Sequence, residues 1–129
     1  MTQDLAASMP LATLLGVSVT RADKDAVEGS LLVKEELCTL GGTLHGGGIM
    51  ALADSLGAIA AFLNLPEGAQ GTTTIESKTN FLRAAPVGTT VSARTVPVNV
   101  GRRLSVWSTT VSGEDGKPVA VVTQTQLVL

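Results

Sequence analysis

Residues 43–54 read TLHGGGIMALAD, and they open the one long helix that the sequence predicts, over residues 46–64. Apolar or small residues occupy nearly every face of this segment, which is typical of a helix buried on all sides. Pro66 and Gly68 end it. Asp54 is its only charged residue, and a buried carboxylate is costly unless it is hydrogen-bonded or paired. Asp54 is therefore either a functional acid or a group with a structural partner, and the charge pattern alone favours neither.

The start of this helix carries His45 and then three glycines, Gly46 to Gly48. Glycine is a poor helix former, costing about 1 kcal/mol relative to Ala in a helix interior. At a helix start, however, it leaves backbone N–H groups open at the positive end of the helix dipole, where a ligand oxygen can approach. The alternative interpretation is a flexible turn in which His45 is only a cap.

The spacing of these two features constrains how they could act together. Asp54 follows His45 by about 2.5 helical turns, so on one continuous helix their side chains would face opposite ways. Asp54 also lies about 12 Å along the axis from Gly46, at ~1.5 Å per residue. One ligand atom cannot touch both within a single chain. If both act on one ligand, a second chain must supply one of them, which predicts a composite site at a dimer interface.

Outside the long helix the sequence is mostly β. Residues 16–22 and 26–34 read as a hairpin, 36–44 as a loop, and 71–83, 89–100, 102–112 and 118–128 as β segments that count as three or four strands. Pro97 indicates an edge or bulge position. Residues 4–15 read as one short helix that stops at Gly16, although Pro10 interrupts its pattern. We therefore expect a single α+β domain over residues 1–129, with an antiparallel sheet wrapped around one helix.

The composition excludes several classes of partner. The net charge is −2, and the longest basic cluster is Arg102–Arg103, so no surface for a nucleic-acid backbone is expected. Tyr is absent and Phe and Trp are few, which argues against base stacking. Cys38 is the only cysteine, so no intrachain disulfide can form. The N-terminus lacks the pattern of a signal peptide, and no apolar run of membrane-spanning length is uninterrupted, so we expect a cytoplasmic protein with no membrane partner.

Residues 43–54 resemble the HGG…ALAD/E signature of hotdog-fold acyl-CoA thioesterases. The most similar groups are the PaaI-like phenylacetyl-CoA, the 4-hydroxybenzoyl-CoA and the dihydroxynaphthoyl-CoA thioesterases. Residues 81–88 resemble the FLRP…G segment of that family, and the resemblance extends over about residues 14–128. It implies hydrolysis of acyl-CoA thioesters without a metal or another cofactor. It also implies a dimer of hotdogs, often paired into a homotetramer, with active sites at the subunit interface. The small Ala58 and the few aromatic residues allow an aryl or a medium-chain acyl group and do not choose between them.

The resemblance gives each residue of the signature a role. Asp54 would be the nucleophile or general base toward the thioester carbon. The backbone N–H of Gly46 or Gly47 from the other subunit, next to His45, would polarise the thioester oxygen. Six residues before that histidine many relatives carry Asn or Gln, which places the water or the thioester, and this chain departs from them with Thr39.

Further substrate-binding candidates come from the same resemblance. Thr74 aligns with a polar site residue of some relatives. Ala58 stands where others have a polar residue one turn after the acid, and Ser55 is adjacent to the acid but points about 100° away around the helix. By residue type the arginines are ordinary surface charges, but the resemblance makes them candidate ligands of the substrate, with the pair at the start of residues 102–112 facing the CoA phosphates: Arg83, Arg102 and Arg103.

Other interpretations remain open at this stage. The hotdog fold also serves as a non-catalytic acyl-CoA binding or sensing module, although an acid at the catalytic position argues against that role. A hotdog hydratase or dehydratase uses a different loop pattern. Trp107 is expected in the core or an interface rather than under an adenine ring, and Cys38 is expected to be buried rather than nucleophilic.

Overall fold

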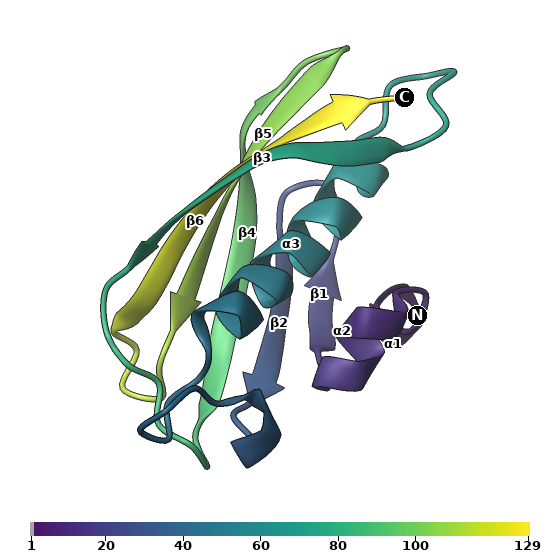
Figure 1. Ribbon diagram of the computed structural model, residues 1–129. Helices are drawn as coiled ribbons and strands as arrows, with labels where there is room; N and C mark the ends of the chain where they lie inside the picture. Colours follow the sequence, from purple (N-terminus) through teal and green to yellow (C-terminus); the bar gives the residue numbers. More distant parts are fainter. Residues whose placement is uncertain (1) are drawn as a thin grey trace.

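The fold is one antiparallel sheet laid over a single long helix. The computed structural model describes residues 2–129 and has the sheet order β1-β2-β4-β5-β6-β3, with α3 crossing one face (Figure 1). The predicted α+β architecture is confirmed, and the four late β segments are four strands. The elements are α1 (Thr2–Ala7), α2 (Pro10–Leu15), β1 (Ser18–Ala22), β2 (Val27–Leu32), a 3₁₀ turn (Glu35–Leu37), α3 (Gly46–Leu63), β3 (Thr72–Phe81), β4 (Thr90–Val100), β5 (Leu104–Ser112) and β6 (Pro118–Val128).

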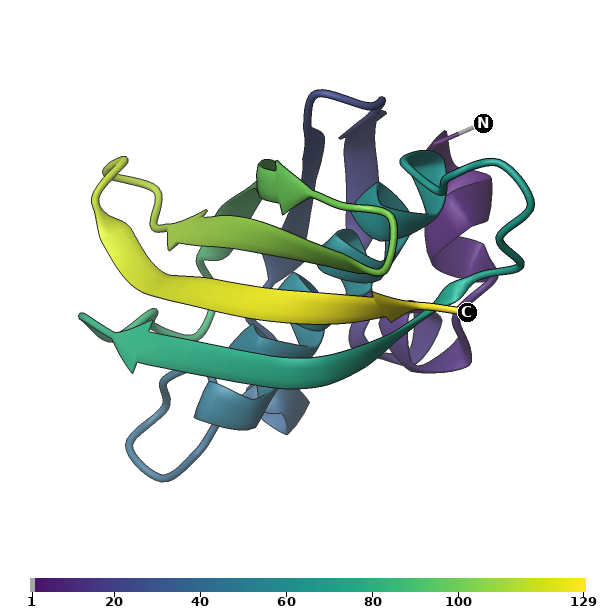
Figure 2. The same cartoon turned by 90° about the horizontal axis from the view of Figure 1, so that it is seen from above.

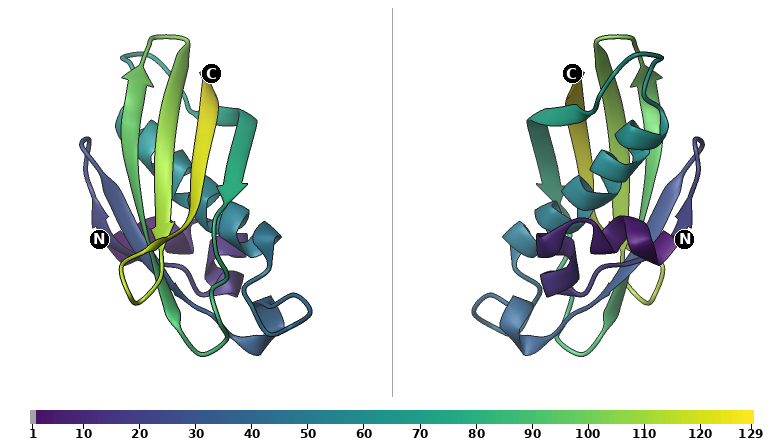
Figure 3. Two further views of the ribbon diagram at one scale, coloured as in Figure 1. Left: turned by 90° about the vertical axis from the view of Figure 1, so that its left-hand side faces the viewer. Right: turned by 90° about the vertical axis from the view of Figure 1, so that its right-hand side faces the viewer.

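The N-terminal segment is two short helices, so the prediction of one helix over residues 4–15 is wrong. Pro10 is the reason: it has no N–H to donate within a helix, and it therefore begins α2 instead of continuing α1. Gly16 ends α2 as predicted, in the left-handed conformation with φ of 88°. Figures 2 and 3 show α1 and α2 beside β1 and α3, at the end of the sheet away from β3.

The core lies between α3 and the inner face of the sheet. Side chains alternate between this face and solvent along the strands, and burying each large apolar one contributes about 1.5–3 kcal/mol. Trp107 on β5 is fully buried, and its Nε1 donates to Ser105 Oγ at 2.8 Å, which confirms its placement in the core. The largest apolar side chains that fill the middle of this layer are Leu31, Leu52, Leu56, Val91 and Val111.

One side of α3 is open, so the prediction of a helix buried all round is wrong. The sheet covers one side of α3, whereas Gly47, Asp54 and Phe62 are exposed. In length and mean hydropathy, 1.6, α3 could also cross a membrane, but half of it is buried within the fold, as in the core helix of a globular domain. The sequence misleads because Ala and Gly fit a buried face and an open one equally well.

β3 is an edge strand ten residues long. It pairs with β6 on one side only, and its other edge offers unpaired N–H and C=O groups. Pro97, in contrast, lies on the interior strand β4, where the register shifts between Pro97 and Asn99. β2 pairs with β4 only as far as Thr95, so the missing N–H of Pro97 leaves no bond of that ladder unmade. The predicted bulge is confirmed.

Candidate active site

Asp54 lies on the open side of α3, next to β3. The hydroxyl of Thr74 on β3 donates to Asp54 Oδ1 at 2.9 Å, a hydrogen bond strengthened by the charge of the carboxylate. Among the side chains that the structure describes, those of residues 5–129, none donates a hydrogen bond to Oδ2. The carboxylate is exposed, so the expected cost of burying it does not arise in a single chain. One oxygen is therefore held and the other is free for a ligand.

Two buried glutamines lie behind this pair, and the sequence analysis missed them. Gln126 Nε2 donates to Thr74 Oγ1 at 2.7 Å and to Gln124 Oε1 at 2.6 Å. Gln124 Nε2 in turn donates to the backbone oxygen of Ala53 at 3.0 Å. A signal was available: residues 124–126 read QTQ on the last strand, which places both amides on the face where β6 otherwise presents Val122.

His45 is the N-cap of α3 and lies outside the helix. The expectation that His45 and Asp54 face opposite ways holds only for two residues within one helix, so it does not apply here. Its Nδ1 accepts from the N–H of Gly47 at 2.8 Å, and its carbonyl oxygen accepts from Gly48 and Ile49. Of the two N–H groups expected to be open, that of Gly47 is thus occupied. The N–H of Gly46 has no acceptor among residues 2–129, so it is the donor that the helix start leaves available.

Comparison with known proteins decides the family. The model of the thioesterase superfamily matches residues 41–120, which include the start of α3, Asp54 and Thr74. The chain belongs to the thioesterase superfamily. Its predicted hotdog fold is confirmed, and it is a thioester hydrolase.

Among solved structures, a mutant thioesterase from Pseudomonas aeruginosa is 30% identical with a TM-score of 0.92, covering 100% of this chain and 94% of that one. A mutant of the phenylacetic acid degradation protein PaaI from Thermus thermophilus is 31% identical with a TM-score of 0.86, covering 94% of this chain and 100% of that one. The 1,4-dihydroxy-2-naphthoyl-CoA hydrolase of Escherichia coli is 32% identical over 93 residues, 72% of this chain and 67% of that protein.

The three remaining candidates on α3 and in the loop before it differ in burial and in hydrogen-bond partners. Thr39 is exposed in a small turn before His45, where its N–H donates to Thr43 O at 2.8 Å. Ser55 is buried, and its hydroxyl donates to Ala51 O one turn back at 2.8 Å, so it has a partner within the helix. Ala58 lines a hollow of about 360 Å³ whose other walls are apolar apart from one serine: Leu5, Ser8, Met9, Ile59 and Phe62.

The arginines of the thioesterase are not brought to Asp54 within one chain. Arg83 lies 3.8 Å from Asp115, with both side chains about half exposed, and such a pair contributes little. Arg102 and Arg103 are exposed in the turn between β4 and β5. Figure 1 shows this turn at the end of the sheet away from the start of α3.

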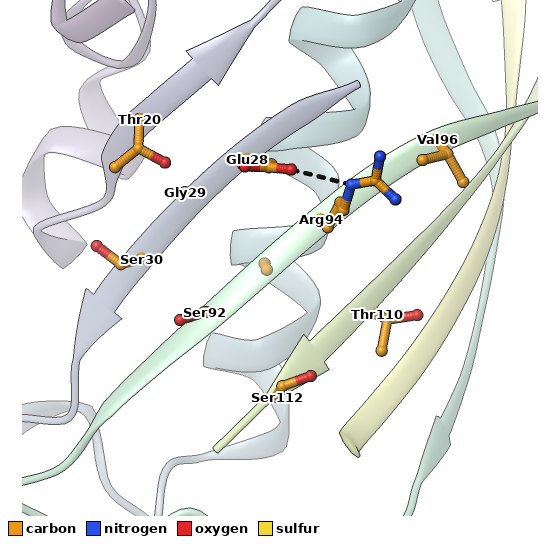
Figure 4. A pocket seen from close by; sticks show the side chains of 10 residues that line it. Thr20, Glu28, Gly29, Ser30, Ser92, Arg94, Val96, Thr110 and Ser112 are labelled. Atoms are coloured by element: carbon orange, nitrogen blue, oxygen red, sulfur yellow. Dashed lines mark hydrogen bonds and ion pairs between the residues drawn. The ribbon is translucent and has the colours of Figure 1, made fainter. Parts of the chain in front are cut away.

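A hollow of about 550 Å³, larger than the one at Ala58, is on the opposite face of the sheet (Figure 4). Its floor is made of short polar side chains such as Ser30 and Ser92, with Arg94 Nε bound to Glu28 Oε2 at 2.9 Å. α3 lies behind the sheet in this view, so Asp54 is on the far side. Size alone therefore does not identify the active site. Among the side chains of residues 5–129 no group of three His, Cys, Asp or Glu residues is placed to hold a metal ion.

Proposed function

We propose that the protein hydrolyses acyl-CoA thioesters with an aryl or medium-chain acyl group, using Asp54 as the catalytic carboxylate. The observation that carries this proposal is the setting of Asp54: exposed on the one open side of α3, with Oδ1 held by Thr74 and Oδ2 unoccupied by the side chains of residues 5–129. A held carboxylate with one free oxygen can either take a proton from water or bond to carbon.

Both routes end in the free acid and CoA. As a general base, Asp54 takes a proton while the water oxygen bonds to the thioester carbon. As a nucleophile, Asp54 bonds to that carbon itself, and water then cleaves the resulting anhydride. In either route the C–S bond breaks and the CoA sulfur leaves with the electron pair and takes up a proton. A single turnover in ¹⁸O water followed by mass spectrometry tests the nucleophile route: water that attacks the Asp54 carbonyl of the anhydride leaves ¹⁸O in the Asp54 carboxylate, which general-base hydrolysis never labels, so label in Asp54 establishes the anhydride.

The developing oxyanion needs a donor, and Gly46 offers one. Its N–H is at the positive end of α3 and has no acceptor among residues 2–129. The N–H of Gly47 already donates to His45, which fixes the imidazole and the first turn. We assign polarisation of the thioester oxygen to Gly46, with His45 and Gly47 shaping the turn.

Gly46 and Asp54 belong to different subunits of one site in this proposal. They are about 12 Å apart along α3, too far to share one thioester within a chain. The free edge of β3 and the exposed Ile75 next to Thr74 support pairing with a second copy along that strand. When two copies of β3 pair as antiparallel edges across a two-fold axis, the two α3 helices also run in opposite directions. The Gly46 end of each helix then faces the body of the partner helix. The active species is then a dimer, or a tetramer made of two such dimers.

The acyl group fits the apolar hollow at Ala58. Ala58 follows Asp54 by one helical turn, about 6 Å further along α3. The walls of the hollow come from α1, α3 and the segment between α1 and α2. The E. coli relative acts on a naphthoyl-CoA, an aryl thioester, which agrees with a hollow of this kind. Ala58→Leu should raise KM for benzoyl-CoA or octanoyl-CoA and leave acetyl-CoA hydrolysis unchanged, and equal effects on all three would contradict the placement.

The decisive experiment uses proline as a probe of the Gly46 N–H. Gly46→Pro removes this N–H at the first position of a helix, where proline is tolerated, and His45 already has extended backbone angles compatible with a following proline. We expect kcat for benzoyl-CoA to fall by about 10²–10³-fold, the effect of losing one oxyanion donor. Gly46→Ala is the matched control: its Cβ also meets the Phe81 ring, but the N–H remains.

Subunit sharing is tested by mixing chains that are inactive alone. Asp54→Asn and Gly46→Pro chains, unfolded and refolded together, form hybrids in which one of the two sites has both wild-type groups. We expect recovery of about one quarter of wild-type activity from random pairing of two chains. Light scattering should show a dimer or larger. No recovery from mixed chains, or an active monomer, would contradict the shared site.

A further inference from the structure

We propose that Gln124 and Gln126 are positioning residues, which fix the direction of the hydrogen bond from Thr74 to the catalytic carboxylate. This inference rests on the proposed function of Asp54. Both glutamines are almost completely buried on β6, with exposures of 0% and 1%, beneath α3. A buried amide costs about 1–3 kcal/mol unless its hydrogen bonds are made, so a pair of amides at this place needs a specific partner set.

The direction of every bond in the network follows from its first acceptor. The carbonyl of Ala53 can only accept, so the group of Gln124 that meets it is the NH₂. The Oε1 of Gln124 then accepts a hydrogen bond from the NH₂ of Gln126 at 2.6 Å. The second hydrogen of that NH₂ points to Thr74 Oγ1 at 2.7 Å. Because the Thr74 hydroxyl has a single hydrogen and already accepts from Gln126, that hydrogen is directed to Asp54.

The network therefore begins and ends on neighbouring residues of α3. It starts at the backbone of Ala53 and returns to the side chain of Asp54, passing through β6 and β3. A hydroxyl without this support would be free to rotate and to accept from water instead of donating. With it, Oδ1 is held by a donor at all times and Oδ2 keeps one orientation toward a reacting atom, as electrostatic preorganisation requires.

Gly57 gives independent support for this arrangement. It lies in the middle of α3, where glycine costs about 1 kcal/mol relative to Ala. A Cβ at this position would overlap the side-chain amide of Gln124. The missing side chain is therefore what lets Gln124 reach the Ala53 carbonyl. In addition, the buried Oε1 of Gln126 has no partner among residues 2–129, so this residue acts here through its NH₂ alone.

A double-mutant cycle tests the relay. The variants are Gln126→Met, Thr74→Val and the double change, with kcat and KM measured on an acyl-CoA that the wild type hydrolyses. We expect each single change to lower kcat about tenfold, with KM changed less than about twofold, because the network positions the acid rather than binding substrate. The double variant should be no slower than Thr74→Val, because Gln126 acts through Thr74. An unchanged kcat in Gln126→Met, or losses that multiply, would overturn the proposal.

Two further variants separate positioning from general stability. Thr109→Val removes another buried hydroxyl, which shares a 2.6 Å hydrogen bond with Thr95 on β4, and it should keep kcat. Gln126→Glu keeps the shape but replaces the donating NH₂ by an oxygen that takes the hydrogen of Thr74. It should lower kcat at least as much as Gln126→Met. If it keeps wild-type kcat, the direction argument is wrong even where Gln126→Met fails to fold.

An NMR measurement keeps this test separate from the proposed function. The side-chain amide protons of Gln126 should shift in Asp54→Asn and in Thr74→Val, but not in Thr109→Val. A wild type that hydrolyses no acyl-CoA would defeat the proposed function, while these shifts would still establish the network. Absence of the shifts in an active enzyme would overturn the network alone.

Discussion

The sheet beneath α3 has an apolar half and a polar half, and the two glutamines of the polar half are as deeply buried as the aliphatic side chains of the apolar half. On β2, β4 and β5 the inner face presents aliphatic side chains such as Leu31, Val91 and Val111. On β6 and β3 it presents Gln124, Gln126 and Thr74, which lead to Asp54. Burial therefore does not distinguish the core from the support of the active site. What distinguishes them is the kind of interaction that replaces water.

The two halves differ in how much geometry they specify. Apolar burial is non-directional and scales with area, so it stabilises the fold without fixing one orientation of a group. Hydrogen bonds lose most of their strength when misaligned, so the polar half fixes the direction of each donor. We therefore expect changes in the apolar half to alter stability and changes in the polar half to alter catalysis.

The largest expected loss of kcat comes from Asp54, the residue to which the polar half of the sheet leads. Asp54→Asn keeps the volume but removes the negative charge and the basicity. It should lower kcat by at least about 10²-fold with little change in KM, the usual scale for a positioned acid–base group. The control is Glu76→Gln on β3, a carboxylate whose Oε1 accepts from Thr125 and which lies outside the network. A variant that keeps more than about a tenth of wild-type kcat would remove Asp54 from the mechanism.

A pair of variants sets the two halves side by side. Leu31→Ala in the apolar half should lower the free energy of unfolding by about 2–5 kcal/mol and leave kcat of the folded enzyme unchanged. Gly57→Ala should lower it by about 1–3 kcal/mol through overlap with Gln124 and should also lower kcat. Helix propensity alone predicts the opposite sign for Gly57→Ala, a gain of about 1 kcal/mol. Urea unfolding measures the free energy of unfolding, and steady-state kinetics measures kcat. A Gly57→Ala variant that is more stable and fully active would contradict the difference between the two halves.

A smaller effect is expected from charges that belong to neither half. Arg102→Ala with Arg103→Ala should raise KM for an acyl-CoA about tenfold at low salt and leave kcat nearly intact, since phosphate contacts far from the scissile bond act as uniform binding. The matching acyl-pantetheine lacks the nucleotide phosphates and should be indifferent to the change. Equal losses on both thioesters would mean that these arginines are structural.

The smallest effect is expected at Thr39, which is exposed in the turn before His45. If its hydroxyl replaces the amide found in relatives, Thr39→Val should lower kcat a few-fold, about the effect of one lost hydrogen bond. Thr39→Gln should keep or raise kcat. The same rate in Thr39→Val and wild type would show that this position lies outside the site.

Several features of the site could be predicted because their signals are local. The start and end of α3, the cap at His45, the glycines after it and the acid at Asp54 are all read within residues 45–68. The bulge at Pro97 and the stop at Gly16 are likewise properties of single residues and their neighbours. Pro10 is a local signal of the same kind, because proline begins a helix far more readily than it continues one, and it separates α1 from α2.

The resemblance of residues 43–54 and 81–88 to thioesterase segments thus identified the family, and the capping and apolar pattern determined the start and end of α3. The sequence also predicts Asp54 as the acid and, from its axial spacing to Gly46, a second chain in the site. Only the tertiary structure decided that Asp54 is open to solvent, that the N–H of Gly46 rather than Gly47 is available, and that two glutamines support the acid. Gln124 reaches Ala53 across 71 residues of sequence and Gln126 reaches Thr74 across 52. Such contacts exist only after α3, β3 and β6 have packed together, because packing alone selects which buried amide meets which carbonyl.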